Sequence, residues 1–351
     1  MTFVAKPQVH HPKLPLNEIG LTRRDYEGSV STLCAGCGHD SVSAAIVQAC
    51  ANLSIPPHRF AKISGIGCSS KTPSYFLNKS HGFNSVHGRM PSVATGASLA
   101  NRDLYCIGVS GDGDSASIGL GQFAHIVRRR INMLYIVDNN GTYGLTKGQF
   151  SATNDKGSTS KKGVPNLYDP IDLVSMALQL GASFVARSFS GDKRQLVPLI
   201  QAGLQHKGMA FIDVISPCVA FNNHNGSTKS YDYVRGHTQP VVGADYISPA
   251  EEITADYQPG TTEDVKMPDG SRLRLRKIDD GYDPHDRVKA LNYVQEHQAQ
   301  GEVVTGLLYV ENDPMDCHDI LRTVDAPLNS LGESELCPGS AALDGVNESY
   351  R

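Results

Sequence analysis

The chain has 351 residues, a formal net charge of −4 at neutral pH and 40% hydrophobic residues, which is enough for one large α/β domain with appendages. It contains neither an apolar run of about eighteen residues nor a basic stripe. We therefore expect no membrane span and no nucleic-acid partner. The N-terminal stretch lacks the apolar segment and cleavage site of a secretory signal, so we expect a cytoplasmic protein.

The N-terminal part predicts an arm followed by a cysteine pair at the start of a helix. Residues 1–25 contain Pro, His and Lys without periodicity. Cys34 and Cys37 then form a C-x-x-C pair, and a helix is expected over 40–52 because apolar residues recur on one side of it. Eight cysteines without a secretion signal indicate metal ligation, redox chemistry or buried thiols rather than a disulfide framework.

The centre of the chain predicts one β-α-β unit. The apolar runs at 104–109 and 133–137 are typical of buried parallel strands, and 117–130 has helical spacing. A Gly-Asp-Gly-Asp sequence at 111–114 follows the first run, and Asn-Asn at 139–140 follows the second. The structural alternative is a tight glycine turn and an unrelated Asn-Asn turn.

This unit places oxygen ligands at one edge of a sheet. Asp112 and Asn140 would lie at the carboxyl ends of two parallel strands, where open α/β sheets bind ligands. A carboxylate and an amide oxygen suit Mg²⁺, which keeps further positions for phosphate oxygens and water. Gly111 and Gly113 would let the backbone approach a diphosphate closely.

The rest of the chain predicts a doubly wound, mostly parallel α/β sheet with an extended, irregular C-terminal region. A strand at 60–66 precedes the central unit. We expect an N-terminal arm at 1–25, one α/β domain at 26–230 and a C-terminal extension at 231–351 that packs on this domain and on a partner subunit. From Asn312 onwards the composition indicates extended chain on a surface. Further helices and strands are expected at 172–180, 183–187, 193–206, 210–215, 286–297 and 303–310.

Four cysteines could together bind one metal ion or cluster. Cys34 and Cys37 form the first pair, while Cys68 and Cys218 each follow a predicted strand. Such spacing suits either zinc or a [4Fe–4S] cluster, and the spacing alone does not separate the two. Cys50 and Cys106 lie in apolar contexts, where a buried thiol acts as a small hydrophobic residue.

Several motifs together carry a resemblance to a known family. They resemble the β subunit of 2-oxoacid:ferredoxin oxidoreductases over roughly residues 30–230, and the long C-terminal part is most similar to 2-oxoglutarate:ferredoxin oxidoreductase β subunits. The motifs are CAGCGHD at 34–40, GIGCSSK at 65–71, HGR at 87–89, GDGD at 111–114, NNGTYGLTKGQ at 139–149 and SPC at 216–218.

The resemblance implies the cofactors and the residues that hold them. It implies thiamine diphosphate, Mg²⁺ and one [4Fe–4S] cluster, with coenzyme A as co-substrate. Cys34, Cys37, Cys68 and Cys218 would hold the cluster, and Asp112, Asn140 and the carbonyl of Thr142 would bind Mg²⁺. Gly111, Gly113, Asp114, His87 and Gly88 would contact the cofactor. Lys71 matches a position near the substrate carboxylate, and Leu145 matches one that lines the substrate site.

The resemblance also implies an activity shared between two chains. We expect coenzyme A-dependent oxidative decarboxylation of 2-oxoglutarate to succinyl-CoA and CO₂, with electrons passing through the cluster to ferredoxin. An α subunit, in an αβ or (αβ)₂ assembly, would supply the glutamate that activates the cofactor. Residues 30–150 contain no glutamate, so this chain alone would be inactive.

Three alternatives stay open from the sequence. The substrate could be pyruvate or a broad set of 2-oxoacids, since the core chemistry is the same. A non-oxidative thiamine diphosphate decarboxylase would keep the fold without needing a cluster. A zinc-ribbon interaction module fused to a nucleotide-binding fold would use the cysteines differently. Locally, His87 could bind phosphate or cap a helix, and Asp114 could orient a metal-bound water or cap the following helix.

Overall fold

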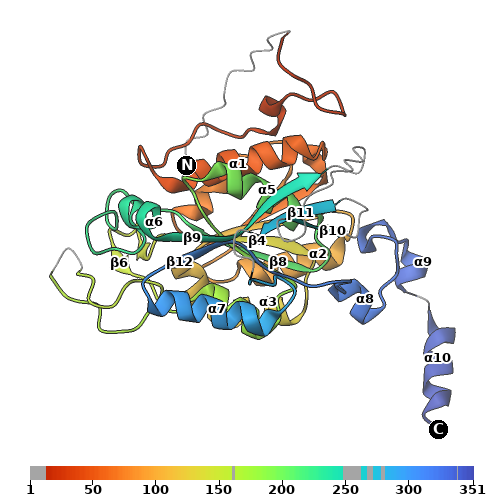
Figure 1. Cartoon of the computed structure of the whole chain (residues 1–351). Coiled ribbons are helices and arrows are strands. Elements are labelled where there is room, and N and C mark those ends of the chain that lie inside the picture. Colours follow the sequence, from red (N-terminus) through yellow and green to blue (C-terminus); the bar gives the residue numbers. More distant parts are fainter. Residues whose placement is uncertain (1–12, 160–162, 248–261, 267–271, 278–280, 338) are drawn as a thin grey trace.

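A ten-stranded sheet forms the centre of the molecule, in the order β10-β11-β9-β12-β7-β8-β4-β3-β1-β2. A computed structural model describes residues 13–159, 163–247, 262–266, 272–277, 281–337 and 339–351. Helices cover both faces of the sheet, which gives three layers (Figure 1). This arrangement confirms the predicted doubly wound α/β class.

Six neighbouring strands of the sheet are parallel. All seven residues of β4 and all seven of β8 are buried, as expected for strands covered on both faces. The six strands are β1 (Phe60–Ser64), β2 (His81–Asn84), β3 (Tyr105–Gly111), β4 (Met133–Asn139), β7 (Phe184–Phe189) and β8 (Met209–Ile215).

The C-terminal part of the chain extends the same sheet. β12 (Val303–Val310) pairs antiparallel with β7, and β9 (Thr238–Ile247) pairs parallel with β12. β11 (Arg272–Lys277) and β10 (Thr262–Lys266) follow as antiparallel neighbours of β9. The part of the chain beyond residue 230 is thus integrated into the core architecture through β12. A separate hairpin joins β5 (Thr142–Tyr143) to β6 (Gln149–Phe150).

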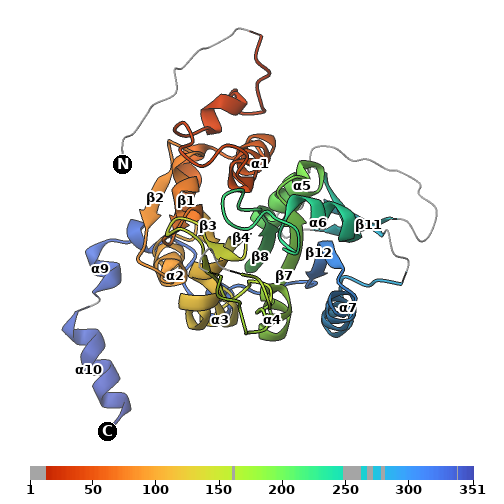
Figure 2. The ribbon, with the colours of Figure 1, turned by 90° about the vertical axis from the view of Figure 1, so that its left-hand side faces the viewer.

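The helices divide between the two faces of the sheet. Figures 1 and 2 place α1 (Gly38–Asn52), α5 (Lys193–Gln205) and α6 (Tyr231–His237) on one side. The other side carries α2 (Met90–Ala100), α3 (Leu120–Arg128), α4 (Leu173–Leu180) and α7 (Arg287–Ala299). Short helical turns are η1 (Arg23–Tyr26), η2 (Pro57–Arg59), η3 (Ser69–Ser74), η4 (Gly113–Ile118) and η5 (Leu328–Ser330). None of the helices in the described ranges is both long and apolar enough to span a bilayer.

The strand order creates a crevice at one edge of the sheet. The chain leaves β1 for β2 on one side and then returns to form β3 on the other side of β1. Such a reversal leaves room for a ligand beyond the carboxyl ends of the two strands. Gly65 follows β1 and Asp112 follows β3, so both glycine-containing motifs border this crevice.

The structure corrects two expectations from the sequence. The helix expected over 117–130 is preceded by a π-helical turn, η4, in which the Gly119 N–H donates to the Asp114 carbonyl five residues earlier at 2.8 Å. The tail after Asn312, expected to be extended, forms α8 (Cys317–Leu321), α9 (Glu333–Leu336) and α10 (Ser340–Ser349). Asp316 explains the first of these helices, because its carboxylate accepts the N–H groups of His318 and Asp319 at 2.8 and 3.0 Å.

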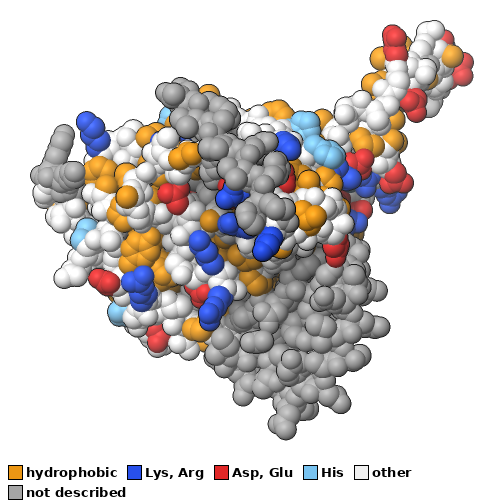
Figure 3. Space-filling view, turned by 90° about the horizontal axis from the view of Figure 1, so that it is seen from above, with side chains coloured by type: hydrophobic (Ala, Val, Ile, Leu, Met, Phe, Trp, Pro, Cys, Tyr) orange, Lys and Arg blue, Asp and Glu red, His pale blue; other side chains and the backbone are white. Residues whose placement is uncertain are grey.

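The surface is mixed in charge on the side seen from above. Basic side chains are scattered among acidic and hydrophobic ones on this face (Figure 3). The C-terminal helix α10 projects from the body (Figures 1 and 2), and its apolar side chains at 343, 346 and 350 are exposed. The N-terminal arm is docked in its described part, since Asn17 donates to the buried Tyr26 hydroxyl at 2.8 Å and to the Ala51 carbonyl of α1 at 3.2 Å.

A buried ion triad joins the start of α4 to β7 and β8. The Arg187 guanidinium donates to Asp213 Oδ2 at 2.9 Å and also pairs with Asp172. Burial acts to raise the pKa of Asp172, but the Arg187 charge and the hydrogen bonds from Ser175 outweigh it, so the pKa is lowered overall. The ionised triad is therefore the folded form at neutral pH.

We predict that Asp172→Asn lowers the free energy of unfolding by about 1–3 kcal/mol at neutral pH, because a charged hydrogen bond to Arg187 is lost. Since the folded pKa of Asp172 lies below the ordinary 3.8, its contribution is present above pH 3.8 and is lost as pH falls through the folded pKa. Urea unfolding across pH should thus show a smaller acid-induced loss in the variant. Asp169→Asn is the control, because the Lys156–Asp169 pair is exposed and is worth less than about 1 kcal/mol. Equal effects of the two substitutions would contradict the prediction.

Candidate functional site at the carboxyl edge of the sheet

A cavity lies at the carboxyl ends of β1, β3 and β4, where the sequence predicts the site. It brings together most of the predicted residues from five separate motifs. The lining residues are His39, Ile66, Gly67, Cys68, Ser69, His87, Gly111, Asp112, Gly113, Asp114, Asn140, Thr142, Tyr143, Gly144, Leu145 and Thr146.

Close backbone approach explains two glycines of this site. A methyl group on Gly113 would lie 2.6 Å from the Tyr143 ring, whose hydroxyl donates to the Gly113 carbonyl at 2.9 Å. Gly88 has a φ of +68°, and a methyl group there would lie 2.8 Å from Gly119 Cα at the end of the π-helical turn. Both positions require glycine, so the chain keeps bare backbone beside the cavity.

Three oxygen-bearing residues converge at the inner end of the cavity. The Asn140 N–H donates to Asp112 Oδ1 at 3.2 Å, and the Thr142 N–H donates to Asn140 Oδ1 at 3.0 Å. Asn222 fixes the loop further by donating to the Asn140 carbonyl at 2.7 Å. The donor set of one carboxylate, one amide oxygen and one backbone carbonyl fits a Mg²⁺ ion that keeps positions for phosphate.

Two hydroxyl groups hold Asp112 from behind. Ser151 donates to Asp112 Oδ2, and the Thr153 hydroxyl lies 2.6 Å from the same oxygen. Burial raises the pKa of Asp112, whereas the hydrogen bonds from Ser151, Thr153 and Asn140 oppose that rise. These hydroxyls come from the loop after β6, and no motif in the sequence singled them out.

The sequence left open whether Asp114 orients a metal-bound water or caps a helix, and the structure shows it holding two other segments. Its Oδ1 accepts the Gly88 N–H at 2.8 Å and its Oδ2 accepts the Ser110 hydroxyl at 2.8 Å. Asp114 therefore ties the loop at His87 and Gly88 to the end of β3. His87 is exposed and faces the same cavity, which leaves its imidazole free to meet a ligand there.

The four predicted cysteines gather beside this cavity. Cys68 and Cys218 flank one backbone position, since a methyl group on Gly144 would lie 3.6 and 3.3 Å from their sulfurs. Cys37 lies at the start of α1, where the Gly38 N–H approaches the Pro217 carbonyl at 3.5 Å. Cys34 is exposed and lies near enough to Cys68 and Cys218 to act electrostatically on both thiols.

The buried thiols are protonated at neutral pH, so binding a metal to them would release protons. Burial raises the pKa of Cys37 to about 12, and the nearby Asp138, Cys218 and Cys68 add to it. Burial likewise raises the pKa values of Cys68 and Cys218, with Lys71 opposing the rise at Cys68. Iron binding would displace these protons, because thiolates are the ligands.

Among the residues that the structure describes, no three His, Cys, Asp or Glu side chains are grouped around a point where they could hold one metal ion. The Mg²⁺ site proposed here needs only one carboxylate from this set. A four-iron cluster binds each thiolate to a different iron atom, so it does not require the ligand sulfurs to meet at a single point.

A buried acid, Asp138, and a buried histidine, His39, lie close to Asn140, and the sequence did not single out the acid. His39 Nδ1 lies 2.6 Å from the Ser216 hydroxyl and 3.8 Å from Asp138 Oδ2, and His39 Nε2 lies 3.4 Å from the Asn140 amide nitrogen. Burial lowers the pKa of His39 to about 4. Burial raises the pKa of Asp138 well above its usual value, and neither of its oxygens accepts a hydrogen bond from the described residues.

Of the two residues predicted to meet substrate, Leu145 lines the cavity and Lys71 does not. Lys71 lies in η3 and donates to the Thr32 carbonyl at 3.3 Å. Its positive charge acts to lower the pKa of Cys68. Leu145 lines the cavity and is 53% exposed. Both side chains are accessible from outside the chain.

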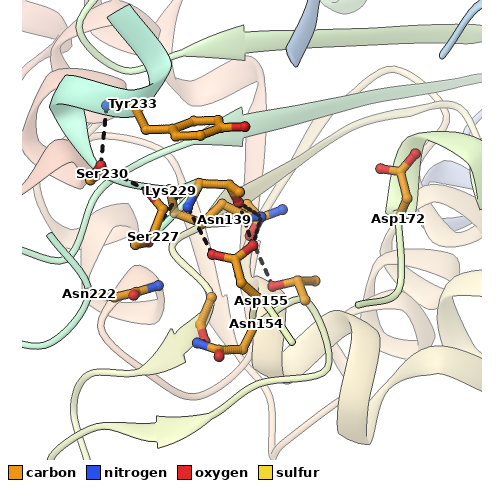
Figure 4. A network of polar contacts seen from close by, with 12 residues as sticks. Asn139, Asn154, Asp155, Asp172, Asn222, Ser227, Lys229, Ser230 and Tyr233 are labelled. Carbon is orange, nitrogen blue, oxygen red and sulfur yellow. Dashed lines mark hydrogen bonds and ion pairs between the residues drawn. The ribbon is translucent and has the colours of Figure 1, made fainter. Parts of the chain in front are cut away.

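A polar network leads from Asp112 through Thr153 and Asn139 to Asp213. Asn139 donates to Asp213 Oδ1 at 3.0 Å, and Thr153 lies 3.0 Å from Asn139 Oδ1. Figure 4 shows Asp155 and Lys229 side by side, with Asp172 across a cavity of ≈ 230 Å³. The hydrogen bonds thus run from Asp112 to the buried ion triad.

A larger cavity of ≈ 340 Å³ lies at the opposite, amino edge of the sheet. Arg59, Arg102 and Lys207 border it beside the first residues of β3 and β4. None of the predicted site residues lines it. Because the motif residues line the smaller cavity at the carboxyl edge, we take that cavity as the candidate site.

Comparison with known protein families supports a cofactor site in this part of the chain. Residues 65–214 match the model of the family described as thiamine pyrophosphate enzyme, C-terminal TPP binding domain. The match begins just after β1, runs through most of β8 and includes the Gly-Asp-Gly and Asn-Asn motifs.

Curated relatives carry names from one enzyme family. The chain is 40% identical over 193 residues to the 2-oxoacid:ferredoxin oxidoreductase subunit beta of Sulfolobus sp, which covers 55% of this chain and 63% of that protein. It is 38% identical over 206 residues to the 2-oxoglutarate synthase subunit KorB of Methanocaldococcus jannaschii, covering 58% of this chain and 75% of that protein. The chain thus spans less than two thirds of the length of the Sulfolobus relative.

A solved structure extends the likeness to most of the chain. It is the 2-oxoglutarate:ferredoxin oxidoreductase from Magnetococcus marinus with 2-oxoglutarate, coenzyme A and succinyl-CoA bound. The TM-score is 0.71 at 30% sequence identity, and the match covers 87% of this chain and 90% of that one.

We predict that Gly113→Ala lowers the free energy of unfolding by about 1–3 kcal/mol, because the new methyl group overlaps the Tyr143 ring. Denaturant unfolding of the purified chain measures this loss. The matched control is Gly121→Ala in α3, where nothing lies within 4 Å of the added methyl group. That control should be neutral or more stable by up to about 1 kcal/mol, since alanine favours helix. A neutral Gly113→Ala variant would contradict the close approach.

Proposed function

The chain belongs to the family of 2-oxoacid:ferredoxin oxidoreductase β subunits, and from this membership we propose that it is the thiamine diphosphate-binding subunit of such an enzyme. The reaction is the coenzyme A-dependent oxidative decarboxylation of 2-oxoglutarate to succinyl-CoA and CO₂, with ferredoxin as electron acceptor. The single observation that carries the proposal is the convergence of Asp112, Asn140 and Thr142 with the cysteines at one sheet edge.

Each group of side chains has a task in this proposal. Asp112, Asn140 and the Thr142 carbonyl hold Mg²⁺, while Ser151 and Thr153 keep the Asp112 carboxylate oriented. The bare backbone at Gly111 and Gly113 admits the diphosphate. When bound, thiamine diphosphate supplies an electron sink for decarboxylation and an iron–sulfur cluster supplies one-electron transfer.

Four thiolates are proposed to hold one [4Fe–4S] cluster in this subunit. Cys68 and Cys218 face the same backbone position at Gly144, which also lines the cofactor cavity. Cys34 and Cys37 approach from the start of α1. The cluster would therefore lie beside the cofactor, as a short electron path requires.

The substrate carboxylates require positive charge, and Lys71 is the candidate in this chain. Its ammonium group is partly exposed and donates to the Thr32 backbone carbonyl at 3.3 Å. An ion pair in a site closed by a partner would be stronger than the same pair in water. Leu145 would line the pocket beside it. Pyruvate or other 2-oxoacids are the alternative substrates.

We further propose that a partner α subunit completes the site. Leu145 is exposed at the cavity, and residues 30–150 carry no glutamate to activate the cofactor. The C-terminal extension from residue 231 packs on the α/β sheet through β12, and the exposed apolar residues of α10 offer a second contact to the partner. The assembly would be αβ or (αβ)₂.

We predict that anaerobic co-purification with the partner subunit gives about four irons per αβ unit, as one [4Fe–4S] cluster requires. Ferredoxin or viologen reduction should depend on both 2-oxoglutarate and coenzyme A. Comparison with pyruvate tests the substrate. Zinc in place of iron would favour an interaction module. Decarboxylation without a reducible iron–sulfur absorption would favour a non-oxidative decarboxylase.

We predict that Lys71→Ala lowers kcat/KM for 2-oxoglutarate by about 10- to 100-fold, the range set by one charged hydrogen bond. Steady-state kinetics of the complete enzyme measure it, and thermal unfolding should stay unchanged because Lys71 lies at the surface of η3. Lys79→Ala serves as control, since its exposed ammonium group lies 3.9 Å from the Asp25 carboxylate. An unchanged kcat/KM for Lys71→Ala would remove the assigned role.

A further inference from the structure

The Asn140 side chain can serve a metal ion at only one of its two ends. Its Oδ1 has lone pairs for a cation, whereas its Nδ2 carries only N–H groups. Asn140 is buried, so water does not compensate for a wrong orientation of the amide. The contacts that fix the rotation of this amide therefore decide whether the proposed Mg²⁺ site has its amide oxygen.

One contact at each end of the amide fixes this rotation. The Thr142 N–H donates to Asn140 Oδ1 at 3.0 Å, and because a backbone N–H can only donate, the oxygen must lie on that side. Asn140 Nδ2 then faces His39 Nε2 at a distance of 3.4 Å. A rotated amide would place N–H groups against the Thr142 N–H and would move the oxygen to the histidine.

These contacts assign the tautomer of His39. The imidazole is 1% exposed, and burial favours its neutral form, which has one N–H and one lone pair. Because Asn140 Nδ2 is a donor, the lone pair lies at Nε2 and the proton at Nδ1. His39 Nδ1 lies 2.6 Å from the Ser216 hydroxyl, which accepts this N–H, and 3.8 Å from Asp138 Oδ2. Oxygen atoms thus surround the nitrogen that carries the proton.

The start of α1 holds the His39 ring in place. A methyl group on Gly38 would lie 2.5 Å from Ser216 Oγ and 2.6 Å from Ser190 Oγ, so this backbone packs directly on the residues that follow β8 and β7. The Ser43 hydroxyl donates to the His39 carbonyl at 3.1 Å. The lone pair at Nε2 is therefore presented to Asn140 from a fixed position.

We propose that His39 is a positioning residue for the metal site, whose Nε2 accepts from the Asn140 amide and so keeps Asn140 Oδ1 turned towards Mg²⁺. This inference rests on the proposed function. His39 acts through Asn140, and it lies two residues after Cys37. The helix start that carries a proposed cluster ligand would thus also orient a proposed magnesium ligand.

Removal of the imidazole would leave the Asn140 Nδ2 group without its acceptor. A buried donor without an acceptor is costly, so the amide would no longer be restricted to one orientation. Partners that orient metal ligands typically change metal affinity by about 10- to 100-fold when they are removed. The metal affinity is therefore the quantity that reports this role.

The test measures the Kd for Mg²⁺ of the complete αβ enzyme with excess thiamine diphosphate, by calorimetric titration after removal of Mg²⁺. We expect His39→Leu to raise this Kd about 10- to 100-fold, because leucine has no lone pair. His39→Gln should raise it less than about tenfold, since its amide oxygen can accept from Asn140. The matched control is His206→Leu, which removes another buried imidazole, one whose Nε2 lies 2.8 Å from the Ser183 hydroxyl, and should leave the Kd unchanged.

A double-mutant cycle separates amide orientation from a general structural role. In the Asn140→Asp variant both ends of the side chain are oxygen atoms, so rotation no longer removes a ligand. Adding His39→Leu to this variant should change the Kd for Mg²⁺ by less than about threefold, because the two substitutions act on the same contact. The iron content should equal that of the wild type in each variant.

The outcomes separate this inference from the proposed function. An unchanged Kd for His39→Leu, or equal increases for His39→Leu and His39→Gln, would overturn the positioning role alone. An equal loss of affinity with and without Asn140→Asp, or loss of iron together with Mg²⁺, would show a purely structural role and would also overturn it. Wild-type enzyme that binds no thiamine diphosphate would overturn the proposed function and the inference with it.

Discussion

The pairing of β1, β3, β4 and β8 as parallel neighbours is the constraint on which the site depends. Each strand is followed by a residue that the sequence predicts to bind a metal, and parallel pairing places all of these residues at one edge of the sheet. Cys68 follows β1, Asp112 follows β3, Asn140 follows β4 and Cys218 follows β8. A change of register in any of these strands would move its ligand along the edge and flip its side chains between the two faces.

The burial that builds this edge also sets its electrostatics. Asp112 and Asp138 lie in the same buried region, and burial raises the pKa of each. Asp112 receives hydroxyl and amide donors that favour its ionised form, as a metal ligand needs. Asp138 receives none from the described residues, so its neutral form is favoured. These two carboxyls, one at the end of β3 and one in the neighbouring strand β4, thus have different environments, because hydrogen bonds and not burial distinguish them.

The site is exposed at two places, the cavity at Leu145 and the loop at Cys34. Towards Leu145, the surface is open at the cofactor cavity and suits a partner that closes it and excludes water. Towards Cys34, Val219 and Arg235, these side chains are exposed on the surface beside the cysteine loop. The cysteines lie between these two directions, with Cys68 lining the cavity and Cys34 exposed at the other side.

The sequence alone determined the central β-α-β unit, because apolar runs and a glycine-acid turn are local signals. The positions of Asp112 and Asn140 at strand ends follow from it directly. The tertiary structure decided what local patterns do not encode. It brought Ser151 and Thr153 behind Asp112, placed Asp138 beside His39, gave Asp114 its bonds to Gly88 and Ser110, and set Tyr231 on the Gly36 carbonyl. It also formed helices in the tail, where the composition had indicated extended chain. These contacts join residues far apart in the chain, and hydrogen bonds between such residues depend on the packing of the whole sheet rather than on the periodicity of any one segment.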